Sequence, residues 1–179
     1  LGMKELPVHI ECFDNSNIQG TNPVSACVVF RNAVPSKKDY RHFKVKTVVG
    51  ANDYATMKEV VNRRYSRMLE ENPDDLPQLI VIDGGKGQLS FAYEALSELG
   101  LIGKVTLIAL AERMEEVYMV GDPYPMFIDR NSPALKVLQQ IRDEAHRFGI
   151  TFHRNLRSKA QVESVLRSIK GVGDKTEQR

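Results

Sequence analysis

Residues 79–88 read L-I-V-I-D-G-G-K-G-Q, a pattern that predicts a strand, a turn and the start of a helix. Four aliphatic residues ending at Asp83 predict a strand buried on both faces, because an unbroken apolar run leaves no face for solvent. The glycines Gly84, Gly85 and Gly87 predict a tight turn that lets a ligand approach the backbone. Helical spacing of apolar residues resumes directly afterwards. Since open α/β sheets place their chemistry at the carboxyl ends of strands, Asp83 is a candidate functional residue.

The order of the other predicted elements narrows the fold class. Strands at 9–16, 24–30 and 40–49 are joined by short turns and are therefore expected to be antiparallel. A helix that begins at residue 52 or 53 follows, and then the strand at 79–83 with its helix. A strand at 105–110 comes next, before a small hairpin at 117–128. The last two predicted elements are a helix from Ser132-Pro133 to about residue 157 and a further helix at 162–169. This order predicts an α/β fold in which helices flank a mixed five-stranded sheet, as in ribonuclease H; a doubly wound nucleotide-binding fold would begin β-α-β.

Composition sets broad limits on the protein. The chain has 179 residues, 42% of them hydrophobic and 27% charged, and a net charge of +2, which fits one domain with a small appendage. Residues 147–170 hold six lysines and arginines against Glu163 alone. That segment is either a solvated helix face or a surface for phosphate or another acidic partner.

Other features concern the compartment and the chain ends. Cys12 and Cys27 lie in apolar runs and are expected to be buried, reduced thiols. No signal peptide or membrane-length apolar run is present, so the cytoplasm is the default expectation. Because Leu1 is not an initiator methionine, we expect the chain to be a fragment of a longer protein.

Asp14 and Asp83 occupy matched positions, each at the end of an apolar strand and before a turn. If their strands are neighbours, both carboxylates lie at one edge of the sheet, and paired carboxylate oxygens suit Mg²⁺ or Mn²⁺. The alternative is that each is a helix cap or a turn aspartate. His146 borders the apolar face of the predicted helix, where it is either a structural histidine or, beside Arg142 and Arg147, part of a site that handles phosphate.

Two further glycine-rich segments concern phosphate binding. Gly84-Gly85-Lys86-Gly87 lacks the complete phosphate-loop pattern, so nucleotide hydrolysis is unsupported, and no serine or cysteine triad is recognisable. Ile169-Lys170-Gly171-Val172-Gly173 matches the turn of a helix-hairpin-helix, in which the backbone N–H groups of Gly171 and Gly173 would contact a DNA phosphate.

Taken together, the motifs resemble the C-terminal half of the UvrC family, a component of the excinuclease ABC, in the family's order and over nearly the whole chain. The matching segments are Ile10-Glu11-Cys12-Phe13-Asp14-x-Ser16, Tyr40-Arg41-x-Phe43, Asp53-Tyr54-Ala55, Arg63-Arg64-Tyr65, Ile82-Asp83-Gly84-Gly85-Lys86-Gly87-Gln88, Ser132-Pro133-Ala134-Leu135, Arg142-Asp143-Glu144-Ala145-His146-Arg147-Phe148 and Phe152-His153-Arg154. Two positions depart from the pattern: Asn17 stands where histidine is expected, and Asn52 where a second acid often precedes Asp53.

The resemblance implies a ribonuclease H-like endonuclease domain at residues 1–158, followed at 159–179 by a linker and the truncated start of a helix-hairpin-helix DNA-binding domain. It implies the 5′ incision in bacterial nucleotide excision repair, with Asp14, Asp83 and His146 as an Asp-Asp-His set at a Mn²⁺ or Mg²⁺ ion. The implied partners are damaged double-stranded DNA and the damage-recognition subunit UvrB.

The surrounding charged residues receive roles from their types and positions. Lys86, Arg142 and Arg147 are candidates for DNA phosphate contacts. Asp53 and Glu144 are possible accessory ligands, for which we favour a helix cap and a salt-bridge partner respectively. The alternative function is a catalytically inactive ribonuclease H-like module that binds DNA or protein.

Overall fold

The computed structural model describes residue 3 and residues 7–16, 23–45, 52–111 and 116–169 of the chain. By internal contacts the chain separates into two compact units, residues 1–149 and residues 150–179. The first unit carries the sheet and the candidate site. In the second unit, residues 150–168 form the end of a long helix, on which Arg154, Arg157, Lys159 and Arg167 are exposed.

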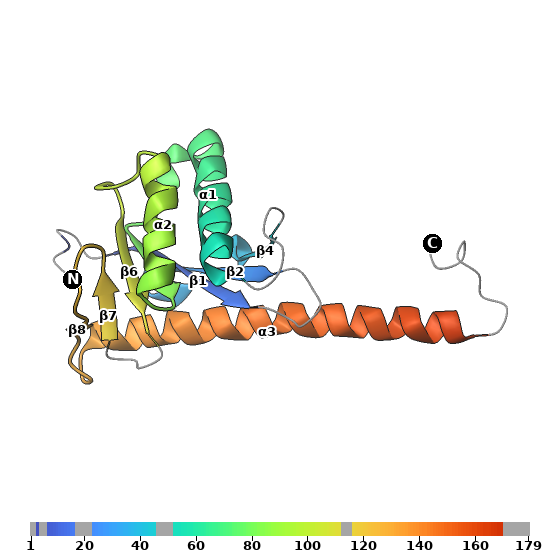
Figure 1. The fold of residues 1–179 in the computed structure, drawn as a ribbon. Helices are drawn as coiled ribbons and strands as arrows, with labels where there is room; N and C mark the ends of the chain where they lie inside the picture. Colours follow the sequence, from blue (N-terminus) through green and yellow to red (C-terminus); the bar gives the residue numbers. More distant parts are fainter. Residues whose placement is uncertain (1–2, 4–6, 17–22, 46–51, 112–115, 170–179) are drawn as a thin grey trace. The chain divides into compact units, whose positions relative to one another are not determined.

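The first unit is built on a mixed sheet, which has eight strands in the described part of the chain. These strands are β1 (His9–Ser16), β2 (Val24–Arg31), β3 (Val34–Pro35), β4 (Arg41–Lys44), β5 (Leu79–Asp83), β6 (Thr106–Leu110), β7 (Glu116–Met119) and β8 (Met126–Phe127). The strand order is β3-β2-β1-β5-β6-β7-β8, and β4 also pairs with β2. The pairs β1·β5 and β5·β6 are parallel, whereas the outer pairs are antiparallel. Figure 1 shows the sheet with the two helices α1 and α2 side by side on one of its faces.

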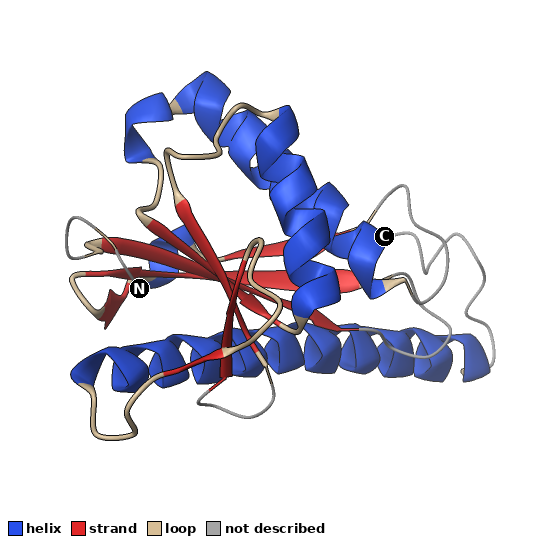
Figure 2. Ribbon diagram, turned by 60° about the vertical axis from the view of Figure 1, so that its left-hand side comes forward, coloured by secondary structure: helices blue, strands red, loops and turns tan. Residues whose placement is uncertain are grey.

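Helices cover both faces of this sheet (Figure 2). On one face, α1 (Asp53–Glu71) and α2 (Lys86–Glu98) pack on a core that includes Phe13 and Ile82. On the other face lies the first half of α3 (Pro133–Ser168), whose Leu138, Ile141 and Ala145 belong to a second core with Cys12 and Val81. Two 3₁₀ turns, η1 (Lys37–Asp39) and η2 (Pro73–Asp75), complete the unit.

Local signals in the sequence correctly located several elements. The strand at 79–83 is β5, and the Asn52 side chain caps α1 by accepting a hydrogen bond from the Ala55 N–H at 3.1 Å. The mixed α/β sheet flanked by helices is confirmed. Both cysteines are buried free thiols, as expected.

Other details differ from the prediction. The predicted hairpin strands continue the sheet as β7 and β8, and β3 was too short to predict, so the sheet has more than five strands. The separate helix at 162–169 was wrong, because α3 runs without a break to Ser168. Gly149 does not end the helix, since a glycine costs a helix only about 1 kcal/mol and burial of neighbouring apolar residues offsets that cost.

Some predictions are not tested. The third strand is seen at Arg41–Lys44, and residues 46–51 lie outside the described residues. Gly171 and Gly173, which carry the helix-hairpin-helix prediction, also lie outside them. The domain boundary at residues 158 and 159 stays a prediction. Within the described chain we find no helix with the length and apolar content needed to cross a bilayer.

Candidate active site

Asp14 and Asp83 lie side by side on neighbouring strands, which meets the condition under which the sequence predicted that their carboxylates share one edge of the sheet. The strands β1 and β5 are parallel neighbours, and their register pairs Phe13 with Ile82, which brings the next two residues together. Phe13 and Ile82 pack in the core under α1 and α2. Because side chains alternate along a strand, Asp14 and Asp83 project toward the opposite face, which α3 covers.

His146 meets Asp14 from α3. Its ring nitrogen Nδ1 lies 3.3 Å from Asp14 Oδ2, which is at the long end of hydrogen-bond distance. The imidazole is 68% exposed whereas the Asp14 side chain is only 12% exposed. The histidine therefore lies on the solvent side of the site, and the Asp14 carboxylate lies on its buried side.

Gly149 allows α3 to approach the sheet closely beside Asp14. A Cβ atom at this position would lie 3.7 Å from the Ala26 Cβ and 4.0 Å from Asp14 Oδ2. Even a small side chain would thus be in van der Waals contact with the site. The close packing of this helical turn on β1 and β2 sets the height of His146 above the sheet.

Two residues near β4 hold the same turn of α3. The Phe148 carbonyl oxygen, which can only accept, takes a hydrogen bond from His42 Nε2 at 2.8 Å, and the rings of His42 and Phe148 stack at 3.7 Å. Tyr40 OH donates to Glu144 Oε2 at 3.1 Å, and the Tyr40 ring meets Phe148 edge-on. Sequence reasoning gave neither residue a role in the site, although the Tyr40-Arg41-x-Phe43 motif contained the signal.

Glu144 and Arg147 form a pair on the surface of α3. The Arg147 guanidinium donates to Glu144 Oε1, and the same carboxylate accepts from Tyr40. Partial burial acts to raise the pKa of Glu144, but the hydrogen bonds from Arg147 and Tyr40 lower it overall. These contacts match the salt-bridge role favoured for Glu144, while the predicted phosphate contact of Arg147 stays a prediction.

Arg142 belongs to the electrostatic surroundings of the two aspartates. It donates from Nη1 to the Ala111 carbonyl oxygen at 3.4 Å. Burial, followed by the negative charges of Asp83 and Asp14, raises the pKa of the Cys12 thiol, and the Arg142 charge opposes this rise. All three charged groups therefore act on the pKa of the same buried thiol.

The remaining predicted residues lie elsewhere. Lys86 directs its Nζ to the Pro123 carbonyl oxygen, 5.3 Å from the centre of the Tyr118 ring. Asp53 begins α1, but its side chain lies outside the described part of the structure. Gly87 falls inside α2, and a Cβ atom there would overlap the Tyr54 ring at 2.4 Å. Its close approach is thus to α1, which corrects the interpretation of Gly87 as a turn residue opening space for a ligand.

The donor types at this edge fit a divalent cation. Two carboxylates on adjacent strands and one imidazole are ligands that Mn²⁺ and Mg²⁺ accept. Among the side chains that the structure describes, no three from His, Cys, Asp and Glu converge closely enough to hold an ion. Asp14 and His146 are in contact with each other, and Asp83 lies at the end of the neighbouring strand β5.

This strand order, with two carboxylates at the ends of adjacent parallel strands and a histidine on the covering helix, defines a ribonuclease H-like domain. Residues 1–150 match the family model described as the UvrC RNAse H endonuclease domain. The chain therefore belongs to that family.

Curated relatives agree with this assignment. The UvrABC system protein C of Flavobacterium johnsoniae is 64% identical over 170 residues, and that of Porphyromonas gingivalis is 63% identical over 172 residues. These alignments cover 95% and 96% of this chain but 28% of each relative. The chain thus spans little more than a quarter of the length of these relatives.

A solved structure is also similar in part. Endonuclease V of Ciona intestinalis, in complex with DNA containing an inosine, aligns with 59% of this chain and 46% of its own, at 20% identity and a TM-score of 0.42.

Proposed function

We propose that the chain is a divalent-metal-dependent DNA endonuclease domain that makes the 5′ incision beside a lesion, as part of the excinuclease ABC assembly. The observation that carries the proposal is the placement of Asp14 and Asp83 at adjacent ends of parallel strands, on the face that also presents His146. Membership of the UvrC nuclease family supports the reaction class.

Asp14, Asp83 and His146 would hold the ion, Mn²⁺ or Mg²⁺. When bound, a divalent ion polarises the phosphodiester and lowers the pKa of a water for in-line attack, which leaves a 5′-phosphate and a 3′-hydroxyl. Because histidine replaces a third carboxylate, the site carries less negative charge and should hold one ion more readily than two. The nitrogen ligand also favours Mn²⁺ over the harder Mg²⁺.

The nearby cations position the DNA backbone. Arg142 lies in the field of both aspartates and would pair with a phosphate oxygen next to the scissile bond. Arg147 follows His146 in the sequence, and its side chain is exposed. It would leave its ion pair with Glu144 to bind a phosphate of the DNA. Lys86, and the backbone N–H groups of Gly171 and Gly173, are proposed contacts farther along the duplex. The damaged double-stranded DNA would be delivered by UvrB.

The decisive experiment is incision of a lesion-bearing duplex by the complete assembly with Asp83→Ala in the full-length protein. The 5′ cut should be lost and the 3′ cut retained, since the resemblance assigns the 3′ cut to a separate nuclease domain. Glu98→Ala is the matched control. Glu98 on α2 forms an exposed ion pair with Lys58 on α1, and loss of this pair should change neither cut. Survival of the 5′ cut in Asp83→Ala would overturn the assignment.

Metal binding separates an enzyme from an inactive module of the same fold. Titration of Mn²⁺ into the full-length protein, followed by electron paramagnetic resonance, should show an ion that Asp14→Asn and Asp83→Asn each release. An unchanged Mn²⁺ signal in both variants would favour a module that binds DNA or protein without cutting it.

A further inference from the structure

Two motifs of the sequence meet in one pocket outside the candidate active site. Arg41 and Phe43 of the Tyr40-Arg41-x-Phe43 motif lie on β4, and Arg63-Arg64-Tyr65 lies on α1. Arg41, Phe43, Arg63 and Arg64 line a pocket of about 300 Å³. The rest of its lining consists of Arg31, Arg67, Met68, Asn72 and the four carboxylates Glu11, Asp39, Glu71 and Asp75. The pocket is on the α1 face of the sheet, opposite the face on which Asp14 and Asp83 project.

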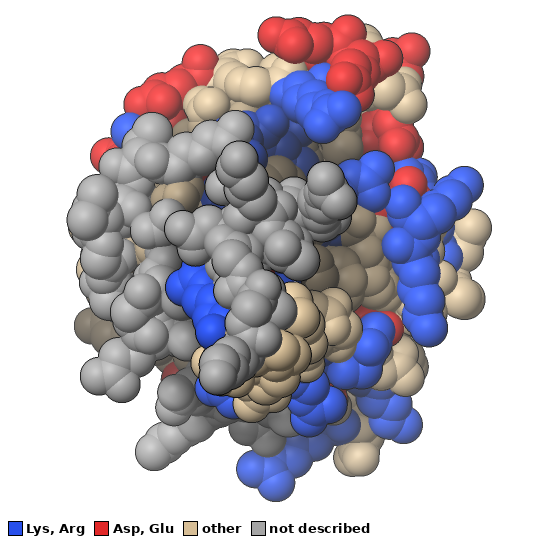
Figure 3. All heavy atoms as spheres, turned by 90° about the vertical axis from the view of Figure 1, so that its right-hand side faces the viewer, with Lys and Arg blue, Asp and Glu red and all other residues tan. Residues whose placement is uncertain are grey.

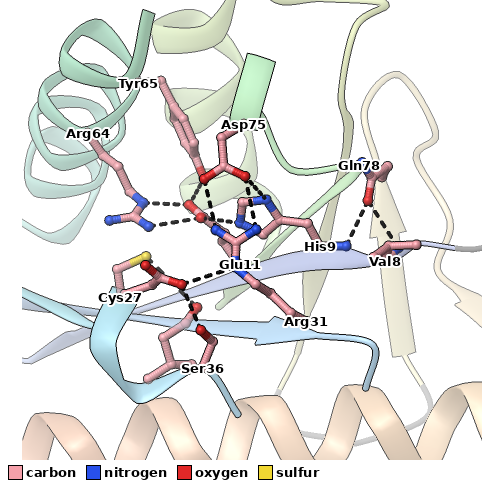
Figure 4. A network of polar contacts seen from close by, with 12 residues as sticks. Val8, His9, Glu11, Cys27, Arg31, Ser36, Arg64, Tyr65, Asp75 and Gln78 are labelled. Carbon is pink, nitrogen blue, oxygen red and sulfur yellow. Dashed lines mark hydrogen bonds and ion pairs between the residues drawn. The ribbon is translucent and has the colours of Figure 1, made fainter. Parts of the chain in front are cut away.

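On the inner wall of the pocket, the positive charges of Arg64 and Arg31 are paired with carboxylates of the chain itself. The buried Glu11 carboxylate accepts hydrogen bonds from Arg64 Nη2 at 2.8 Å and Tyr65 OH at 2.8 Å, and it contacts His9 Nε2 at 2.6 Å (Figure 4). Arg31 donates to both oxygens of Asp75, at 2.9 and 2.8 Å. Because these cations are satisfied by carboxylates of the chain itself, they shape the pocket and leave ligand binding to its rim.

Arg41 and Arg63 form that rim, and neutral groups orient both of them. The exposed Arg41 donates from Nη1 to the carbonyl oxygens of Lys38 at 3.1 Å and Tyr40 at 2.7 Å. Arg63 donates to the Lys44 carbonyl oxygen at 2.7 Å, and its guanidinium carbon lies 5.4 Å from the centre of the Phe43 ring. Arg63 also donates to the Glu59 carboxylate at 3.3 Å, an i,i+4 ion pair that a bound phosphate would have to share. Two fixed guanidinium groups at one rim make a receptor for an anion.

The positive charge continues along the strand that carries Arg41. Lys37, Lys38 and Lys44 are exposed on η1 and β4. Figure 3 shows lysine and arginine side chains gathered on the right of the face in view, below a margin of acidic side chains. Lys37, Lys38, Arg41, Lys44 and Arg63 thus form a basic strip along the β4 edge of the sheet, in which the alternation of side chains along β4 sends Lys44 to the face opposite Arg41.

Arg41 of the strip and the candidate active site lie on nearby strands but on opposite faces of the sheet. Arg41 pairs with Cys27, and Cys27 pairs with Phe13, the residue before Asp14. Two inter-strand spacings amount to about 10 Å. A DNA strand would therefore contact Arg41 and Asp14 together only by passing around the β4 edge of the sheet.

We propose that Arg41 and Arg63 bind a phosphate of the DNA backbone, at the β4 edge of the sheet and away from the scissile bond. The proposal rests on the proposed function, which makes DNA the substrate. A phosphate fits better than an acidic segment of a partner protein, because the pocket offers only Phe43 and Met68 as apolar lining. Protein interfaces draw most of their affinity from larger buried apolar and aromatic anchors.

The test is the salt dependence of DNA binding by the full-length protein carrying Arg41→Ala and Arg63→Ala. Each phosphate contact contributes about 0.9 to the slope of log affinity against log salt, so loss of the one proposed contact should lower the slope by about 0.9. The rate of incision at saturating protein should change less than about twofold, since these residues position DNA without touching the reacting atoms. The charge-conserving Arg41→Lys and Arg63→Lys pair should restore most of the slope.

Lys104→Ala is the matched control, because Lys104 is an exposed cation in the turn before β6, away from the pocket. It should leave the slope unchanged, and a single Arg41→Ala variant provides a milder test should the double variant fold poorly. An unchanged slope in the double and single arginine variants overturns the proposal. Loss of incision only with the complete assembly, at an unchanged slope, would indicate instead a docking site for an acidic protein partner.

The Asp83→Ala variant separates this proposal from the proposed function. Asp83→Ala should bind DNA with the parental slope while failing to cut. If Asp83→Ala still cuts, the proposed function fails, and the slope measured for the arginine variants still decides whether the pocket binds phosphate.

Discussion

Glu11 and Asp14 lie three residues apart on β1, yet their carboxylates face opposite environments. Glu11 points under α1, is fully buried, and is surrounded by Arg64, Tyr65 and His9. Asp14 points toward α3, where His146 contacts it at 3.3 Å with a largely exposed ring. One strand thus carries a carboxylate that stabilises the fold and another that is placed for chemistry.

The difference is electrostatic. Burial by itself would raise the pKa of Glu11, but hydrogen bonds from Arg64 and His9, with their charges, lower it to about 2. A buried charge is tolerated only when it is paired and hydrogen-bonded, and Glu11 satisfies both conditions. Asp14 lies next to a second aspartate instead, and such a pair is better suited to a cation from solution.

The largest expected effect is on the Asp14 side of this comparison. Asp14→Asn should reduce the 5′ incision at least about 1000-fold, because a metal site supplies several kcal/mol and each 1.4 kcal/mol is about tenfold in rate. Stability in urea should change by less than about 1 kcal/mol, since the ion pair of Asp14 with His146 involves a largely exposed imidazole. Incision assays and urea unfolding of the same preparation test both expectations. A large loss of stability would show that Asp14 resembles Glu11 after all.

The reverse result is expected for Glu11. Glu11→Ala leaves Arg64 without its carboxylate in a buried site and should cost about 3–5 kcal/mol of unfolding free energy. Incision per folded molecule should remain near the parental value. Urea unfolding followed by circular dichroism measures the loss. A cost below about 1 kcal/mol would mean that the Glu11 network is not a main support of the fold.

The pH dependence of stability sharpens the same contrast. The pKa of Glu11 is about 2 in the folded protein and 4.5 ordinarily, so its stabilisation is complete above about pH 5 and is lost as the pH falls toward 2. The loss amounts to roughly 3 kcal/mol, because a tenfold change in a proton affinity corresponds to about 1.4 kcal/mol. Glu11→Gln should therefore flatten the acid limb of the stability curve. Parallel curves for the two proteins between pH 5 and 2 would contradict this account.

The smallest effect concerns the position of α3 over Asp14. His42→Ala removes the stack on Phe148 and the hydrogen bond to its carbonyl oxygen, and it should lower incision about tenfold through displacement of His146. His42→Gln keeps a donor for that oxygen and should recover most of the rate. The loss should fall on the rate at saturating DNA and not on DNA affinity. An equal loss of rate in the two variants would show that the hydrogen bond from His42 to the Phe148 carbonyl oxygen does not position α3.

Prediction from the sequence succeeded where the signal was local. The apolar run before Asp83 specified a buried strand, and Asn52 marked the start of α1. The similar contexts of Asp14 and Asp83 predicted that both carboxylates share one edge of the sheet if their strands are neighbours, and the structure shows that β1 and β5 are neighbours. The Glu11 network left a weaker local signal, an acid two residues after His9 in an apolar strand, and that signal was not used.

Contacts between distant segments could not be predicted in this way. His42 and Phe148 are 106 residues apart, and Arg64 and Glu11 are 53 apart, with no sequence pattern that pairs them. Gly87 matches a turn glycine in sequence, but its closeness to Tyr54 depends on how α1 and α2 pack. These pairings result from how helices dock on the sheet.

The sequence by itself determined the strands, their carboxylate ends, and the membership of a nuclease family, because hydrophobic period and motif spacing are local properties. Only the tertiary structure decided which carboxylate of β1 is buried against arginine and which faces the helix that carries His146. That decision depends on the pleat, which sends Glu11 toward the arginines of α1 and Asp14 toward the histidine of α3.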